Sequence, residues 1–463
     1  MVLAMNNTKW AEFLNGLRGK RVAVCGIGKN NLPVIRQLLA GGVRVLACDR
    51  HTREELGETA AELEKAGAEL ALGEAYLADL EVTLILRTPG MKPYLPEFEQ
   101  ARRRGIPVTS EMELFLQFCP APVYAVTGSD GKTTTTTVIA GLLKAAGKTV
   151  HVGGNIGRPL LPELDTVQPQ DAVVVELSSF QLTGMTQSPH VAVVTNIAPN
   201  HLDWHTDMQE YVDAKRNLIA YQTAADRAVL NADNAYTAAF AAEAPGDTYT
   251  FSRRTPQQKG AWLNDHGDLC YTAGGKTTVV MQASDIKIPG VHNIENYLAA
   301  IAAVWGEVPP AVIRTFAQEF GGVAHRCELV RTLHGVRYYN DSIGSSPSRT
   351  IAGLEAFDRP VILIAGGYDK HIPYAPLGPV AARTVKTAIL LGATADAIEA
   401  SIRACSDLPI VRVNSMEQAV ETAHKLATDG DIVFLSPASA SFDMYKNFEQ
   451  RGEHFRSLVL ALD

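Results

Sequence analysis

The chain has 463 residues, of which 46% are hydrophobic and 20% are charged. This length and composition are typical of roughly two to four soluble globular domains, each with enough apolar side chains for its own core. The formal net charge of -8 argues against a general nucleic-acid binder, because such proteins are more often basic.

Cysteine spacing and the lengths of the apolar runs bear on the cellular compartment of the protein. The six cysteines are scattered without C-x-x-C spacing, so we expect reduced thiols rather than a zinc site or a disulfide framework. The first ten residues lack the apolar core of a signal peptide, and no apolar run approaches the ~18 residues of a membrane helix. We therefore expect a cytoplasmic protein with neither nucleic acid nor a membrane as partner.

Short apolar runs alternate with helical patterns from the start of the chain. Residues 21–25 and 43–48 are typical of strands, and a helix is expected between them from about residue 32 to residue 40. This βαβ unit predicts a parallel sheet. Residues 106–109 fit the last strand of a first domain.

Two more sheets are expected further along. The second begins at residues 123–126 and continues through residues 171–177 and 191–196, whose nearly unbroken apolar runs suit strands buried on both faces. Residues 243–282 are richer in Gly, Thr and polar residues, which indicates an excursion of short strands and turns. Strands of a third sheet are expected at residues 361–365, 388–391 and 432–435.

A glycine-rich segment, Thr-Gly-Ser-Asp-Gly-Lys-Thr-Thr, spans residues 127–134, between a predicted strand and a helix that ends near Gly147. Its glycines let backbone N–H groups turn toward phosphate oxygens, and the helix N-terminus adds a partial positive charge. Lys132 would reach the terminal phosphates of a nucleotide, and Thr133 could ligate magnesium. The segment therefore predicts a phosphate-binding loop.

The loop departs from the standard pattern G-x-x-x-x-G-K-[ST], whose first glycine would fall at Val126. An ordinary strand-to-helix turn that happens to contain Gly-Lys-Thr is the alternative. The order strand, loop, helix favours phosphate binding.

Residues 127–134 resemble the phosphate loop of the Mur ligase family, which begins Thr-Gly and continues to Gly-Lys-Ser/Thr. The match extends over nearly the whole chain. It implies an ATP-dependent ligase that activates a carboxylate as an acyl phosphate and couples it to an amino acid. The ATP-binding residues that it implies in the loop are Gly128, Ser129, Asp130, Gly131, Lys132, Thr133 and Thr134.

Two further central motifs carry the resemblance. Asn155 begins an Asn-Ile-Gly turn, and Glu176 and Ser178 belong to a segment that resembles the E-x-S-S-[FY]-Q strand end of the family. The resemblance implies that Asn155 and Ser178 contact the UDP-linked substrate and that Glu176 is a magnesium ligand. Ligands of α/β proteins bind at such carboxyl ends of parallel strands.

His201 and Lys215 complete an implied metal set with Thr133 and Glu176. In the family this histidine ligates a second magnesium ion, and the lysine that follows it, here 14 positions later, is carbamylated. A lysine ammonium cannot bind a cation but a carbamate can, and carbamylation requires a neutral amine whose pKa is lowered by desolvation. A solvated helix lysine is the alternative for Lys215 alone. His205 is interpreted as a surface or supporting residue.

Later motifs supply the remaining ATP groups. Asn293 and Asn296 lie in a His-Asn-x-x-Asn pattern that resembles the family's helix start and would hold the adenine, although Asn293 could also be a plain N-cap. Arg326 of a His-Arg motif would contact the γ-phosphate, and Asp341 of an Asn-Asp-Ser motif would bind the ribose. The catalytic residues implied together are Lys132, His201, Lys215 and Arg326.

The resemblance also implies an amino-acid site near the end of the chain. Lys370, in a Gly-Gly-x-x-Lys turn, would pair with a carboxylate of the incoming amino acid, and its side-chain pocket would be lined by Ser345, Ser441 and Phe448. This set favours D-glutamate. Many members carry Lys where this chain has Ile343, so a cation is missing there or is replaced from elsewhere.

The first domain contains a broken G-x-G-x-x-G at residues 26–31, with Asn at the third glycine. Alone this is a weak dinucleotide signal. The resemblance implies that the loop cradles the UDP diphosphate and that an acidic strand end and a second turn surround the uridine. The residues concerned are Gly28, Lys29, Asn30, Asp49, Thr88, Pro89 and Gly90.

The sequence thus predicts an α/β protein of three domains in series. Residues 1–109 form a Rossmann-like domain that binds the UDP substrate, residues 110–322 a central P-loop-type ATPase domain with a parallel sheet, and residues 323–463 a Rossmann-like domain that binds the amino acid and ATP. The expected substrates are UDP-N-acetylmuramoyl-L-alanine, D-glutamate and ATP, with two Mg²⁺ ions, and a monomer is expected.

Three alternatives stay open at this point. Another Mur ligase or a folylpolyglutamate synthase belongs to the same class. An NAD-dependent oxidoreductase would leave the central ATP and metal residues without a role. A nucleotide-binding regulator without chemistry would not need Glu176, His201 and Lys215.

Overall fold

Three β-sheets flanked by helices make up the described part of the chain, residues 7–202 and 204–463 of a computed structural model. Residues 1–6, part of the segment in which no signal peptide is expected, lie outside it. Contacts divide the described chain into two compact units, one containing the residues up to 281 together with 295–314, the other containing residues 282–294 and 315–463.

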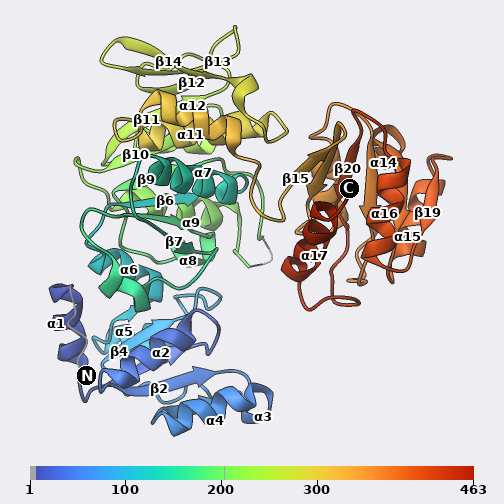
Figure 1. Cartoon of the computed structure of the whole chain (residues 1–463). Coiled ribbons are helices and arrows are strands. Elements are labelled where there is room, and N and C mark those ends of the chain that lie inside the picture. Colours follow the sequence, from blue (N-terminus) through green and yellow to red (C-terminus); the bar gives the residue numbers. More distant parts are fainter. Residues whose placement is uncertain (1–6, 203) are drawn as a thin grey trace. The chain divides into compact units, whose positions relative to one another are not determined.

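The first sheet is parallel, as the sequence predicts, with the order β3-β2-β1-β4-β5 (blue in Figure 1). Its strands are β1 (Arg21–Cys25), β2 (Arg44–Asp49), β3 (Glu69–Leu72), β4 (Leu84–Arg87) and β5 (Val108–Thr109). Its helices are α2 (Asn31–Ala40), α3 (Arg53–Leu56), α4 (Glu58–Lys65) and α5 (Pro96–Arg103), preceded by α1 (Thr8–Leu17).

The central sheet has the order β14-β13-β12-β11-β10-β9-β6-β8-β7. Its strands are β6 (Val123–Thr127), β7 (Val150–Gly154), β8 (Ala172–Glu176), β9 (Val191–Val194), β10 (Arg227–Asn231), β11 (Asp247–Ser252), β12 (Gly260–Leu263), β13 (Asp268–Ala273) and β14 (Lys276–Gln282). The polar segment 243–282 does form short strands, but they extend the central sheet, and β12 pairs with β13 in antiparallel orientation.

Helices of the central region follow the same alternation. They are α6 (Glu111–Phe118), α7 (Lys132–Ala145), α8 (Ser179–Leu182), α9 (Met208–Ala220), α10 (Ala235–Phe240), α11 (His292–Val304) and α12 (Pro310–Glu319), with 3-10 turns η1 (Leu161–Thr166) and η2 (Ala283–Asp285). Helix α7 begins directly after the glycine loop and ends before Gly147, as predicted.

The third sheet has the order β15-β16-β20-β17-β18-β19, with an antiparallel β15–β16 pair that the strand predictions did not include. Its strands are β15 (Glu328–Leu333), β16 (Val336–Asn340), β17 (Val361–Ala365), β18 (Val385–Leu390), β19 (Ile410–Arg412) and β20 (Ile432–Leu435). Its helices are α13 (Pro347–Leu354), α14 (Leu377–Thr384), α15 (Ala395–Arg403), α16 (Met416–Leu426) and α17 (Phe448–Leu460).

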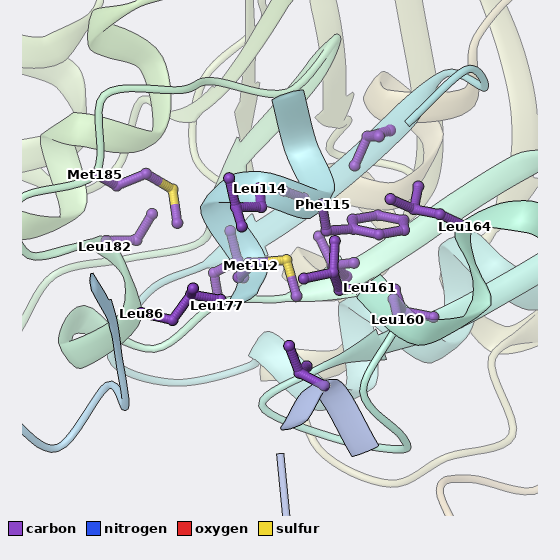
Figure 2. Close-up of a cluster of buried hydrophobic side chains, with 14 of the residues drawn as sticks. Leu86, Met112, Leu114, Phe115, Leu160, Leu161, Leu164, Leu177, Leu182 and Met185 are labelled. Carbon is purple, nitrogen blue, oxygen red and sulfur yellow. The ribbon is translucent and has the colours of Figure 1, made fainter. Parts of the chain in front are cut away.

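One hydrophobic core joins the first sheet to the central one. Helix α6 inserts Met112, Leu114 and Phe115 between Leu86 of β4 and the leucines around η1 (Figure 2). These side chains belong to a single buried cluster, whereas the third sheet has separate clusters on its two faces. The first and central sheets therefore share one interior. The domain boundaries at 109 and 322 stay predictions.

No helix among residues 7–202 and 204–463 is both long and apolar enough to cross a membrane.

Candidate active site

The glycine loop has a backbone that only glycine adopts easily. Gly128 and Gly131 have φ angles of 150° and 78°, and an added Cβ would collide with the Thr195 hydroxyl at Gly128 and with the Asn296 side chain at Gly131. Asn196 anchors the loop, because its Oδ1 accepts the Asp130 N–H at 3.0 Å. The loop is thus fixed against β9 and α11, with α7 beginning at Lys132.

Two lysines converge on one carbonyl of this loop. Lys132 Nζ donates to the carbonyl oxygens of Gly128 and Ser129 at 2.9 Å each, and Lys215 Nζ donates to the Gly128 oxygen at 2.8 Å. Lys215 is 1% exposed. Burial, and then the neighbouring Lys132 charge, hold the pKa of Lys215 well below its usual range. The solvated alternative for Lys215 is therefore wrong.

Glu176 lies at the carboxyl end of β8 and faces the start of α7. Its Oε2 accepts the Thr133 hydroxyl at 2.7 Å, and its Oε1 accepts the Asn155 amide at 2.7 Å. Ser178 caps α8, where its hydroxyl accepts the Gln181 N–H. The structure thus brings together Thr133, Glu176 and Asn155, as expected of neighbouring strand ends.

His201 and Lys215 both lie near the Tyr211 ring. The Tyr211 ring centroid is 4.7 Å from Lys215 Nζ and 6.5 Å from the His201 ring, and the Tyr211 hydroxyl lies 2.9 Å from Ser129 Oγ. His201 is exposed, with φ 56°. His205, by contrast, is buried, with Nε2 3.0 Å from the Ser179 hydroxyl, so it supports α8 from the interior.

These side chains fit magnesium under one condition. Among the described residues no three His, Cys, Asp or Glu side chains gather as a preformed metal cluster. Mg²⁺ in nucleotide sites takes only one or two protein carboxylates and draws its other ligands from phosphates and water, which Glu176 and Thr133 can satisfy. A second ion beside His201 would need an anionic Lys215.

Asn296 belongs to this site through α11. Its Oδ1 accepts the Thr135 hydroxyl at 3.2 Å, below the glycine loop. Asn293 is the second residue of α11, and its amide donates to the Pro289 carbonyl at 2.6 Å.

The glycine-rich loop of the first domain is braced by polar side chains. Asp49 Oδ2 accepts the Ile27 N–H at 2.6 Å, and Asn31, which replaces the third glycine of the motif, donates to the carbonyls of Cys25 and Gly26. Burial opposes ionisation of Asp49, but hydrogen bonds from His51 and Ile27 outweigh it and lower the pKa of that carboxyl. Gly28 and Lys29 are exposed at the carboxyl edge of the sheet.

In the second unit, Asp341 is turned into the interior. Its carboxylate accepts the Ser436 hydroxyl at 2.8 Å and the Cys327 N–H at 3.2 Å, and burial raises its pKa to about 6. Arg326 lies between two residues with left-handed backbones, one of them Cys327. Arg349 donates to the Ile343 carbonyl at 3.3 Å, so a cation lies beside the position where the resemblance led us to expect a lysine.

The segments that carry the residues expected to bind the amino acid are tied together around one buried arginine. Arg451 is 1% exposed and donates to Ser342 and to the carbonyls of Ser439 and Ala440. Ser342 in turn donates to the Phe448 carbonyl at 2.8 Å. Tyr368 N–H donates to the Ala440 carbonyl at 2.9 Å. Through these bonds the turn with Lys370, the segment with Ser441 and the start of α17 with Phe448 are held together. Ser345 lies three residues beyond Ser342 on the same loop.

The parallel sheets, the glycine loop at the start of α7 and the acidic strand end beside it define a nucleoside-triphosphate-binding α/β protein of the P-loop type. The sequence matches the Mur ligase middle domain over residues 126–304 and the Mur ligase, glutamate ligase domain over residues 325–439. The chain belongs to the Mur ligase family.

Relatives with assigned names match along the whole chain. A protein of Acetivibrio thermocellus named UDP-N-acetylmuramoylalanine--D-glutamate ligase is 51% identical, over 99% of this chain and 100% of that protein. A protein of the same name from Symbiobacterium thermophilum is 49% identical, over 96% of this chain and 98% of that protein. The fold resembles that of UDP-N-acetylmuramate-alanine ligase from Thermotoga maritima, with a TM-score of 0.57 at 18% identity, over 96% of this chain and 99% of that one.

Proposed function

We propose that this protein couples D-glutamate to UDP-N-acetylmuramoyl-L-alanine at the expense of ATP, in the synthesis of the peptidoglycan precursor. The observation that carries the proposal is the convergence of Lys132, Glu176 and Lys215 on one glycine loop, in a chain about half identical over its full length to ligases with this name. The protein would work on these small molecules as a monomer in the cytoplasm.

The chemistry follows from the carboxylate. An anionic, resonance-stabilised carboxylate resists attack by an amine, so its oxygen first attacks the γ-phosphorus of ATP, and ADP leaves. Lys132 and the N–H groups at the start of α7 stabilise the charge on the phosphates during this transfer. The D-glutamate amine then attacks the acyl carbon, phosphate leaves, and an amide remains.

We propose two magnesium sites in this arrangement. Thr133 and Glu176 would hold one Mg²⁺ ion, and His201 with a carbamylated Lys215 would hold another. Bound magnesium would neutralise the converging phosphate and carboxylate charges. Asn155 orients Glu176, because its amide donates to the carboxylate oxygen that Thr133 does not use.

The carbamate of Lys215 would form by addition of the neutral amine to carbon dioxide, with loss of one proton. Burial lowers the pKa of this side chain and so favours the neutral amine that the addition requires. The product is an anion in place of an amine.

The second unit would supply the amino-acid site and further ATP contacts. We propose that Lys370 pairs with a D-glutamate carboxylate, while Ser441, Phe448 and Ser345 line the pocket for its side chain. Arg326 would contact the γ-phosphate and Asp341 the ribose, and Asn293 would lie near the adenine together with Asn296 of the first unit.

Phosphate release with each substrate omitted in turn tests the proposed function. Turnover should require ATP, UDP-N-acetylmuramoyl-L-alanine and D-glutamate together, and L-lysine or L-alanine should not replace D-glutamate. Phosphate release from ATP alone at the full rate would contradict the proposal, as would equal rates with L-lysine.

A further inference from the structure

A turn of the first domain lies directly against the catalytic region of the central domain. Thr88 follows β4, and its N–H donates to the Cys25 carbonyl at 2.8 Å. Its side chain packs on Gly26, where an added Cβ would approach Thr88 Cγ2 to 2.7 Å. A displacement of the loop at residues 26–30 would therefore be transmitted to the turn at residues 88–94.

Trp204 bonds this turn to the central domain. Its indole N–H donates to the Gly90 carbonyl at 3.2 Å, and Lys92 Nζ lies 5.2 Å from the centroid of its ring. On its other side Trp204 contacts Phe180, at 4.7 Å between ring centroids, and Phe180 contacts His201 at 4.9 Å. The indole thus lies between the first-domain turn and the proposed metal ligand.

A second tie runs from the same turn to helix α9. The Tyr94 hydroxyl donates to Glu210 in the first turn of α9, and the other Glu210 oxygen accepts the N–H and the hydroxyl of Thr206. Helix α9 carries Tyr211 and Lys215, which contact Ser129 and Gly128 of the phosphate loop. A continuous series of contacts therefore links the two nucleotide loops.

We propose that Trp204 is a positioning residue that couples the binding of the uridine nucleotide in the first domain to the binding of ATP in the central domain. The inference rests on the proposed function and on the family resemblance, which implies that the turn at residues 88–90 surrounds the uridine. Linkage makes the coupling reciprocal, so UDP raises the affinity for ATP by the same factor as ATP raises that for UDP. Through this coupling, binding energy from the uridine end of the substrate would help to position its reacting end.

The interface does not depend on Trp204 for its stability. Buried Arg87, 4% exposed, donates to the carbonyls of Met91 and Thr183, and Pro93 packs on Gly184. Replacing the partly buried indole by a phenyl ring removes the N–H donor and leaves this brace intact.

The test measures the affinity for a magnesium complex of a non-hydrolysable ATP analogue, with and without saturating UDP, by calorimetry on the full chain. We expect UDP to tighten analogue binding about fivefold or more in the wild type. Trp204→Phe should reduce this factor to below about twofold. Trp262→Phe is the matched control, because the Trp262 indole N–H also donates one hydrogen bond, in its case to the Thr272 hydroxyl of β13 at 2.9 Å. This variant should keep the wild-type factor.

Turnover provides the second readout. In the wild type, kcat with an acceptor that lacks the uridine diphosphate should be about tenfold or more below kcat with the full substrate. In Trp204→Phe the two values should approach each other, with kcat for the short acceptor unchanged. An unchanged UDP factor in Trp204→Phe would overturn the coupling and leave the proposed function standing. A wild type that binds UDP and the analogue but turns over no acceptor would overturn the proposed function, while the binding factors would still decide the coupling.

Discussion

Lys215 combines two properties that a free lysine lacks. It is buried beside another amine, and its Nζ already lies against the backbone of the phosphate loop. The resemblance predicts a carbamate at this lysine, and burial on α9, which lowers the pKa of the amine, is a condition that such a carbamate requires. Arg451 and Arg87, by contrast, were not predicted from the sequence. They donate to carbonyls distant in the sequence, 11 to 109 positions away for Arg451, and no local sequence pattern encodes such contacts.

Lys215→Ala should lower kcat by roughly 100-fold or more, because the proposed second magnesium ion would lose its anionic ligand. Formate or acetate should restore part of the activity, since a small carboxylate fits the space left by the side chain. Phosphate-release kinetics with increasing acid would measure this rescue. Lys144 is an exposed lysine of α7, and Lys144→Ala is the control. Its kcat should match that of the wild type and should not rise when formate or acetate is added. Full activity of Lys215→Ala without added acid would exclude the carbamate.

At the scale of elements, apolar runs located most of the strands. Strand β1 coincides with the predicted residues 21–25, and β17 with residues 361–365. The pairing of strands was less accessible, because neighbours in a sheet are chosen by packing across the sheet rather than by local periodicity. That is why β11 to β14 were expected as an excursion and instead extend the central sheet.

Glu111 joins two elements and makes their connection sensitive to pH. From the start of α6 its Oε1 accepts the N–H groups of Leu160 and Leu161 beside η1. Burial raises the pKa of Glu111 to about 7 against these two hydrogen bonds, which lower it. A carboxyl whose folded pKa is raised stabilises the fold fully below its unfolded pKa, and this contribution is lost as the pH rises toward 7.

Glu111→Gln keeps an acceptor oxygen and removes the titration. The free energy of unfolding of wild type relative to this variant should fall by up to about 3 kcal/mol between pH 4.5 and pH 8. Urea unfolding followed by tryptophan fluorescence measures it, because all four tryptophans belong to the first unit. A difference between the two proteins that is constant over this pH range would contradict the expected titration.

On the scale of the whole molecule, the sequence predicted three sheets but not how their interiors are divided. The first and central sheets share a core through α6, whereas the third sheet packs only residues of its own unit on both faces. A shared core cannot be predicted from composition, because the sequence of α6 is that of an ordinary short amphipathic helix and does not show which sheets the helix packs against.

A fragment of residues 323–463, which contains the third sheet and the buried clusters on its two faces, should therefore fold alone, with cooperative thermal unfolding in circular dichroism. A fragment of residues 1–109 should not, because Leu86 and its neighbours would lose α6 and the leucines around η1. Cooperative unfolding of the short N-terminal fragment, or its absence in the C-terminal one, would contradict this division.

The Gly128 carbonyl has one further consequence. A single peptide oxygen accepts hydrogen bonds from two amines, and a carbamate on Lys215 would place a negative charge beside Lys132. The carbamate nitrogen would keep one N–H for that oxygen, and the new anion would attract Lys132. A newly made chain would then become carbamylated only as fast as dissolved carbon dioxide reached its interior. Freshly degassed and bicarbonate-equilibrated preparations of one batch should therefore differ in their affinity for a nucleoside triphosphate.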